Sequence, residues 1–197
     1  MIPQDRHVPE RLFLARHGQT IWNQERRLQG QLDSPLTADG IAQAQSVAQH
    51  LDGAGVTVVC SSPLGRALRT AVIIAERLAV EIIEVPELAD IHHGELAGMT
   101  WDEVDAAFPD AREQRASNRY GWAFPGGESY AQARARARKA LTSCGWATSG
   151  SPLLVSHEMI GRMLRAEIRG LDAAGALALR HPHGVVFELD RGAERML

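Results

Sequence analysis

Residues 12–23 read LFLARHGQTIWN, an apolar run that ends abruptly in an arginine, a histidine and a glycine. A short apolar run between charge and glycine predicts a buried β-strand. Open α/β sheets bind ligands where their strands end, and Arg16 and His17 stand at the end of this strand. A guanidinium suits phosphate or carboxylate, and an imidazole can act as a nucleophile or proton carrier near neutral pH. We expect Gly18 to let the backbone approach a bound ligand closely.

The length and composition indicate one domain. The chain has 197 residues, and its 21 basic and 24 acidic side chains are intermixed, with a formal net charge of −3. This pattern predicts no nucleic-acid surface and no membrane-binding segment, and no apolar run approaches the roughly 20 residues of a transmembrane helix. Cys60 and Cys144 form no C-x-x-C pair or disulfide framework, and the first residues lack a signal-peptide core, so we expect a cytoplasmic protein. Residues 1–10 are expected to be a loose lead-in to a domain over residues 11–197.

Apolar runs and amphipathic stretches alternate along the chain. Further strands are expected at 56–60, 81–85, 152–155 and 184–190, with 81–85 at an edge and 184–190 on the outside of the sheet. This alternation predicts an α/β fold, a three-layer α/β/α sandwich with a mostly parallel central sheet. A TIM barrel is disfavoured because it typically needs about 250 residues and eight β/α units.

Helices are expected over 37–51, 63–78, from Thr100 for two or three turns, over 129–144 and after His157. In the first of these helices, one face carries the apolar residues Ile41, Ala44, Ala48 and Leu51. In the fourth, three arginines occupy every second position, so they cannot share one face, and we expect a solvated surface for Arg134, Arg136 and Arg138.

Two other strands also end in charged or titratable residues. Residues 61–71 read SSPLGRALRTA, and Arg66 falls in the first turn of the helix that begins there, near the edge of the sheet where the first strand ends. Arg69, three residues later, is expected to be solvated. Residues 153–162 read LLVSHEMIGR, so an apolar strand again ends in a histidine, His157.

Two histidine pairs have some of the features of a metal site. His92 and His93 are adjacent, and adjacent side chains point in opposite directions on a strand. His181 and His183 have a spacing that can ligate a metal, but no carboxylate or third ligand stands near them in the sequence. We therefore predict no metal site and interpret His181 and His183 as residues at the rim of the site.

Together these stretches resemble the histidine phosphatase superfamily, the phosphoglycerate-mutase-like proteins, in which a histidine is phosphorylated. Four motifs lie in the family's order between residues 12 and 190: R-H-G-x-T-x-x-N, S-S-P-L-x-R-A-x-x-T-A, L-x-D followed by two glycines, and V-S-H. The resemblance implies that His17 is the nucleophile, that Asp90 donates a proton in place of the usual glutamate, and that the phosphoryl group is held by Arg16, Arg66 and His157. Asp90, rather than Glu95, aligns with the family's acid.

The resemblance also implies how the substrate is bound. Asn23, the backbone around Gln29 and Gly30, and the backbone of Glu158 are expected to contact a small phosphorylated substrate, and no metal or cofactor is required. Residues 99–127 are expected to form a lid-like insertion over the site. Glu158 stands where the family usually has glycine, at the start of a helix that binds phosphate, so we expect its carboxylate to turn outward or to pair with Arg162.

The chemistry of a phosphomonoester fits these residues. The dianion needs positive charge, which we expect from the two arginines and the two imidazoles, and the departing alkoxide needs a proton from Asp90. These positive groups should depress the pKa of Asp90, whereas a general acid needs a raised one. The charge of a bound phosphate offsets that effect.

Three functions agree with the motifs. We favour a metal-independent phosphomonoester hydrolase that acts through a phosphohistidine at His17. A phosphoglycerate mutase is the first alternative, although mutases of this family are generally longer. The second alternative is a catalytically inactive module that binds a phosphorylated ligand. This alternative remains because Asp90 and Glu158 depart from the family's usual residues.

Overall fold

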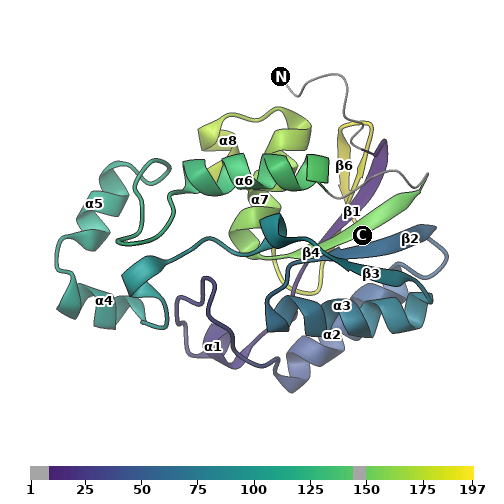
Figure 1. Cartoon of the computed structure of the whole chain (residues 1–197), viewed down its shortest axis with the longest axis horizontal. Coiled ribbons are helices and arrows are strands. Elements are labelled where there is room, and N and C mark those ends of the chain that lie inside the picture. The colour runs from purple at the N-terminus through teal and green to yellow at the C-terminus, as the bar shows by residue number, and fades with distance from the viewer. Residues whose placement is uncertain (1–8, 144–149) are drawn as a thin grey trace.

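Six strands form a single sheet in the order β3-β2-β4-β1-β5-β6 in the computed structural model, which describes residues 9–143 and 150–197 (Figure 1). The strands are β1 (Arg11–Arg16), β2 (Val56–Ser61), β3 (Glu81–Glu84), β4 (Ser151–Ser156), β5 (Val186–Asp190) and β6 (Ala193–Met196). The first four strands in this order are parallel, and β5 and β6 are antiparallel to their neighbours. The expected mostly parallel sheet is confirmed, and the strand predicted at 81–85 lies at its edge as β3.

Helices cover both faces of the sheet and confirm the three layers (Figure 1). One face carries α2 (Ala38–His50) and α3 (Gly65–Leu78), and the other carries α6 (Tyr130–Ser143), α7 (Glu158–Arg169) and α8 (Ala173–Ala178). Most of the remaining helical segments lie beyond one end of the sheet: α1 (Ile21–Gln24), α4 (Trp101–Ala107), α5 (Ala111–Ser117) and the 3₁₀ turn Gly94–Leu96. The 3₁₀ turn Pro86–Leu88 packs against α6 instead. In the described part of the chain, no helix has the length and apolar character needed to cross a membrane.

The apolar face of α2 differs from the expected one at its first turn. Thr37 caps the helix, and Ala44 and Ala48 are buried as predicted, but Ile41 is 36% exposed. Gly40 takes the buried position instead, because its Cα lies against the backbone of Gln19, where no side chain fits. Gly18 is needed for the same contact from the other side, because a Cβ on it would collide with the backbone of Gly40. The expected approach of its backbone to a ligand stays a prediction.

The C-terminal strand pair also differs from the prediction. β5 is an inner strand between β1 and β6, so the expected outer position belongs to β6. Arg191 and Gly192 join the two strands in a tight turn with φ of +48° and +83°. A two-residue turn with positive φ at both positions is typical of a hairpin, but an arginine at the first position is a weak sequence signal for it.

All three arginines of α6 are paired, and only Arg138 is also solvated as expected, because the side chains of Arg134 and Arg136 are mostly buried. Arg134 and Arg138 lie one turn apart and share the buried carboxylate of Glu167, on α7. Arg136 faces another way and donates to both oxygens of Glu128 and to the carbonyl oxygen of Asp90, the last at 3.0 Å. The sequence showed no periodic acidic partner for these residues because the acids belong to other segments. Cys144, at the expected end of this helix, and residues 1–8 of the lead-in lie outside the described residues.

Candidate active site

The ends of β1 and β4 bring the two predicted site histidines together. The strands are parallel neighbours with Arg16 opposite Ser156, and the backbone N–H of His17 donates to the carbonyl oxygen of Ser156 at 2.9 Å. The ring centroids of His17 and His157 are 5.1 Å apart. Two sequence segments about 140 residues apart therefore form one buried imidazole pair at the carboxyl edge of the sheet.

Hydrogen bonds fix the tautomer of His17. Its Nδ1 lies 2.7 Å from the carbonyl oxygen of Gly18, which can only accept, so Nδ1 carries the proton. The Nε of Arg66 donates to Nε2 of His17 at 3.3 Å, so Nε2 carries the lone pair. Burial, Arg16 and Arg66 together hold the pKa of His17 well below its ordinary value. The imidazole is therefore neutral, with its lone pair on the nitrogen that faces Arg66.

Arg66 is fully buried at the start of α3, and each of its five N–H donors has an acceptor. The carbonyl oxygens of Leu32 and Gly30 accept from Nη1 and Nη2 at 2.7 Å each, and Asp33 accepts more weakly from Nη1 at 3.4 Å. The remaining donors point along the Nε/Nη2 edge toward His17 and Asp90, at 3.3 Å in both cases. The loop over residues 30–33 thus holds the guanidinium in place, and its longer contacts lie where a ligand oxygen can replace them.

Asp90 lies beside both of these groups. Its Oδ2 is 3.3 Å from Nη2 of Arg66 and 3.8 Å from Nδ1 of His157, and its Oδ1 accepts from the backbone of Ile91 at 2.9 Å. Burial raises the pKa of Asp90 despite the opposing effect of Arg66 and other arginines. The expected depression of this pKa is wrong, because desolvation outweighs the nearby charges. Glu95, the other candidate acid, is exposed.

His157 is held by a residue to which the sequence gave no role. Its Nε2 lies 2.8 Å from Oγ of Ser62, and its buried Nδ1 has no hydrogen-bond partner among the described residues. Burial, Arg66 and His17 keep the pKa of His157 well below its ordinary value. The two imidazoles therefore do not supply the expected positive charge, and the arginines of the site supply it instead.

A cavity of about 310 Å³ opens in front of these residues. Six predicted site residues line it: Arg16, His17, Asn23, Gln29, Asp90 and Glu158. Arg66, His157 and Gly30 are not among its lining residues, and Arg66 contacts His17 and Asp90, which are. Asn23 uses its Oδ1 to cap α1 through the backbone and hydroxyl of Thr20, so its amide N–H groups are left to donate.

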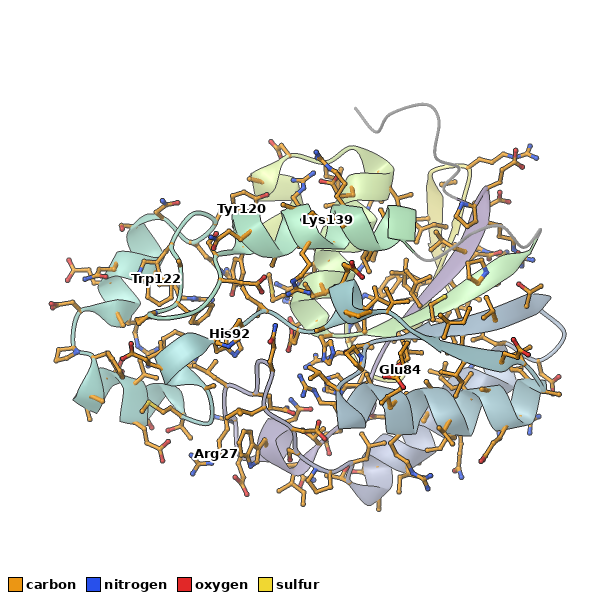
Figure 2. The ribbon with its side chains drawn as sticks, viewed as in Figure 1. Arg27, Glu84, His92, Tyr120, Trp122 and Lys139 are labelled. Atoms are coloured by element: carbon orange, nitrogen blue, oxygen red, sulfur yellow. The ribbon has the colours of Figure 1, made fainter. Side chains whose placement is uncertain are left out.

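The predicted lid contributes the outer wall of the cavity. Arg115 on α5 and Arg119 just beyond it line the cavity together with His93 and Tyr130. Tyr120 and Trp122, labelled in Figure 2, lie on the segment between α5 and α6. Aromatic contacts connect this segment to the body of the domain, because Phe124 packs edge-on against Trp122 at 5.0 Å and against His93 at 4.5 Å.

The loop after α1 is attached to the beginning of the lid. The backbone of Leu28 pairs with Gly98 and Met99 at 2.7 and 2.8 Å. Arg27, at the lower edge of the view in Figure 2, donates to the carbonyl oxygen of Gly98 and to Glu103, both at 2.8 Å. These hydrogen bonds therefore join the loop after α1 to the beginning of the predicted lid.

The side chain of Glu158 lies at the cavity and does not turn away from the site. It pairs with Arg162 one turn later on α7, as expected, and also accepts from Nη1 of Arg16 at 3.0 Å, which the sequence did not predict. The carboxylate thus contacts an arginine that we predict to bind the phosphoryl group.

The two C-terminal histidines occupy different positions. His183 lies at the site, where its Nδ1 is 2.7 Å from the carbonyl oxygen of His17 and the two ring centroids are 5.3 Å apart. His181 is buried and stacks on Phe187 at 5.2 Å, so its predicted place at the rim is wrong. Its ring packs on Gly161, where a Cβ would collide with it. Among the described residues, no three histidine, cysteine or acidic side chains are grouped to hold a metal ion.

Known proteins of similar sequence and structure support this interpretation. Residues 12–196 match the model of the histidine phosphatase superfamily, branch 1. Proteins named "probable phosphoglycerate mutase GpmB" from Serratia proteamaculans and Yersinia pestis are 42% and 40% identical over 170 residues, which are 86% of this chain and 79% of theirs.

Solved structures with this fold are also similar. A mycobacterial glucosyl-3-phosphoglycerate phosphatase in complex with VO₃ has a TM-score of 0.81 and 30% identity, covering 95% of this chain and 96% of its own. YhfR from Bacillus stearothermophilus has a TM-score of 0.82 and 30% identity over 94% of both chains. The family is one of phosphoryl-transfer enzymes, phosphatases and mutases. This chain, with its motifs on neighbouring strand ends and a family match over almost its full length, belongs to the histidine phosphatase superfamily, branch 1.

Proposed function

We propose that this protein is a phosphomonoester hydrolase that needs no metal ion and acts through a phosphohistidine at His17. The observation that carries the proposal is the fixed tautomer of His17. The Nε2 of this neutral imidazole carries the lone pair and faces Arg66, which also contacts Asp90 at the cavity wall. A nucleophilic nitrogen, cationic donors and a carboxylic acid with a raised pKa are the groups that phosphoryl transfer requires.

In the first step, the phosphoryl group binds between the arginines. Its oxygens accept from the Nε/Nη2 edge of Arg66 in place of the long contacts to His17 and Asp90, and also from Arg16 and the amide of Asn23. This exchange frees Nε2 of His17, which attacks phosphorus as the bond to the leaving oxygen breaks. Protonated Asp90 gives its proton to that oxygen, and the alcohol departs.

In the second step, water hydrolyses the phosphohistidine. The carboxylate of Asp90 takes a proton from the water, the new P–O bond forms, and the P–N bond breaks. Inorganic phosphate leaves, His17 returns to its neutral form and Asp90 is protonated again. Arg136 supports this cycle from outside the cavity, because its contact with the carbonyl oxygen of Asp90 holds the loop that carries the acid.

The cavity favours a strongly anionic substrate. Six arginines and two carboxylates line it. The carboxylates are Asp90 and Glu158, and the arginines are Arg16, Arg26, Arg27, Arg115, Arg119 and Arg162. Two of these arginines, Arg115 on α5 and Arg119 just beyond its end, lie at the outer wall, where a second negative charge of the substrate can meet them.

Trapping of the phosphoenzyme tests the proposal. After incubation with a phosphomonoester and an alkaline quench, we expect a covalent phosphate that is stable to alkali and labile to acid. It should be absent in His17→Ala and present in His50→Ala, which changes an exposed histidine on α2. Label that persists in His17→Ala would contradict the assignment, and loss of activity in EDTA would contradict metal independence.

A mutase is the second candidate because the curated relatives are named as probable phosphoglycerate mutases. The two activities differ in the fate of the phosphoryl group. Incubation with a monophosphoglycerate, followed by phosphorus NMR, should show inorganic phosphate accumulating at the rate of substrate loss. Conversion to the isomeric monophosphoglycerate without release of phosphate would identify a mutase instead.

A further inference from the structure

Glu158 places a carboxylate on one of the arginines that we expect to bind the phosphoryl group. Its Oε2 accepts from Nη1 of Arg16 at 3.0 Å, and its Oε1 accepts from Nη2 of Arg162. The side chain of Arg16 is only 14% exposed, and that of Arg162 only 11%. Two poorly hydrated guanidinium groups therefore share one carboxylate at the wall of the cavity.

The contact leaves the binding edge of Arg16 open. A guanidinium presents its Nε and Nη2 donors side by side as a fork, and Glu158 occupies only Nη1, outside that fork. The Nε of Arg16 is buried and has no hydrogen-bond partner among the described residues. An unsatisfied buried donor is costly unless a ligand satisfies it, so the free edge of Arg16 is available to a phosphoryl oxygen while Glu158 stays bonded to the other side.

The charges of the surroundings agree with a counter-ion role. Burial lowers the pKa of both Arg16 and Arg162, and Glu158 is the group that most strongly opposes this effect on each of them. Arg119 and Arg180 lie near enough to lower the pKa of Arg162 further. Glu158 also lines a second hollow together with Arg16, Arg162 and Arg180, and it is the carboxylate among these cationic side chains.

We propose that Glu158 is a built-in counter-ion and positioning residue for Arg16, which keeps the Nε/Nη2 edge of that arginine oriented and lowers the affinity of the site for phosphate. The inference rests on the proposed function, because it takes Arg16 as a ligand of the phosphoryl group. Arg162 acts through Glu158: it holds the second carboxylate oxygen and so prevents the carboxylate from moving toward the substrate. The consequence is an enzyme that binds its inorganic product weakly.

Binding of inorganic phosphate tests the inference without requiring turnover. Calorimetry should show that Glu158→Gln binds phosphate about tenfold more tightly than the wild type at low salt, because a negative charge beside the dianion has been removed. The gain should shrink at 0.5 M salt, where screening is stronger. Glu76→Gln, which removes an exposed carboxylate in the distant half of α3, should leave phosphate affinity within twofold. Unchanged or weaker phosphate binding by Glu158→Gln would overturn the proposal.

A double-mutant cycle separates the role of Arg162 from its own charge. If Arg162 acts through Glu158, Arg162→Met should weaken phosphate binding severalfold in the wild type and less than twofold in the Glu158→Gln background. Equal losses in both backgrounds would show that Arg162 acts on the anion directly and would overturn this part.

The kinetic constants test the positioning part. In Glu158→Gln, we expect kcat to fall severalfold while the inhibition constant of phosphate falls as well, and Glu158→Asp should recover part of kcat. A general loss of structure would lower kcat without tightening phosphate, so that result would overturn the assignment. If instead the phosphohistidine is absent at His17 while phosphate still binds more tightly to Glu158→Gln, the proposed function fails and the counter-ion role stands.

Discussion

His17 and Arg66, at the inner side of the cavity, are held more completely than the arginines of its outer wall. His17 is fixed at both ring nitrogens, and Arg66, which lies behind it, has an acceptor for every donor. On the outer wall, the Nε of Arg115 is buried without a partner among the described residues, and Arg119 is exposed. The contrast predicts that the protein preorganises the proposed reacting groups, whereas a bound substrate orders the outer arginines.

Loss of the inner arginine should have the largest effect. Arg66→Ala removes the donors that we propose to stabilise the transferring phosphoryl group and releases the loop at residues 30–33, so kcat/KM should fall by about 10²-fold or more. Arg69→Ala, an exposed change one turn later on the same helix, should stay within about twofold. Steady-state kinetics check both predictions. Equal losses of kcat/KM in the two variants would show that the buried contacts of Arg66 give it no special role.

The contribution of Asp90 to kcat/KM is expected to grow with the basicity of the leaving group. Asp90→Asn should lower kcat/KM for an alkyl phosphate by about 10²-fold or more and for a nitrophenyl phosphate far less, because a phenolate leaves with little protonation. Asp90→Glu should retain activity, since the family's usual residue is glutamate. Glu95→Gln is the control, and a larger effect there than at Asp90 would reassign the acid.

The outer arginines should change substrate preference rather than chemistry. Arg115→Ala should raise KM about tenfold for a carboxyphenyl phosphate and change it little for phenyl phosphate, because only the first carries a second negative charge for the lid to bind. Arg112→Ala is the matched change, since Arg112 lies on the same helix but pairs with Asp105 outside the cavity. Equal changes in KM for both substrates would show that the outer wall does not recognise the second charge of the substrate.

The smallest expected effect is on stability at acid pH. Burial and Arg16 lower the pKa of His183 to about 4, below its ordinary value of 6.5. Between these values, the unfolded chain binds a proton that the folded protein excludes, so the free energy of unfolding should fall as pH drops from about 6.5 to about 4. Urea unfolding at several pH values should show a shallower fall in His183→Gln. An unchanged slope in that variant would mean that His183 is not kept neutral by its contact with the site.

The sequence by itself determined the elements and the residues at their ends. Apolar runs and capping residues act over a few positions, so five of the six strands of the described chain, the Thr37 and Thr100 caps and the mostly parallel sheet were predicted from local pattern, whereas β6 was not. The motif order indicated the family, which is confirmed. The roles of His17, Asp90 and the other site residues stay predictions, although the structure brings them together at one edge of the sheet.

Only the tertiary structure decided how these residues affect one another. Glu158 meets Arg16 across 142 positions, and Arg136 reaches the backbone of Asp90 across 46, so no local pattern reveals either contact. The same is true of the pKa of Asp90, whose direction depends on whether burial or the arginines prevail. Local periodicity fixes which face of a helix or strand is apolar. The order of the strands and the path of the loops decide which charges then meet, because these interactions act through space and depend on burial.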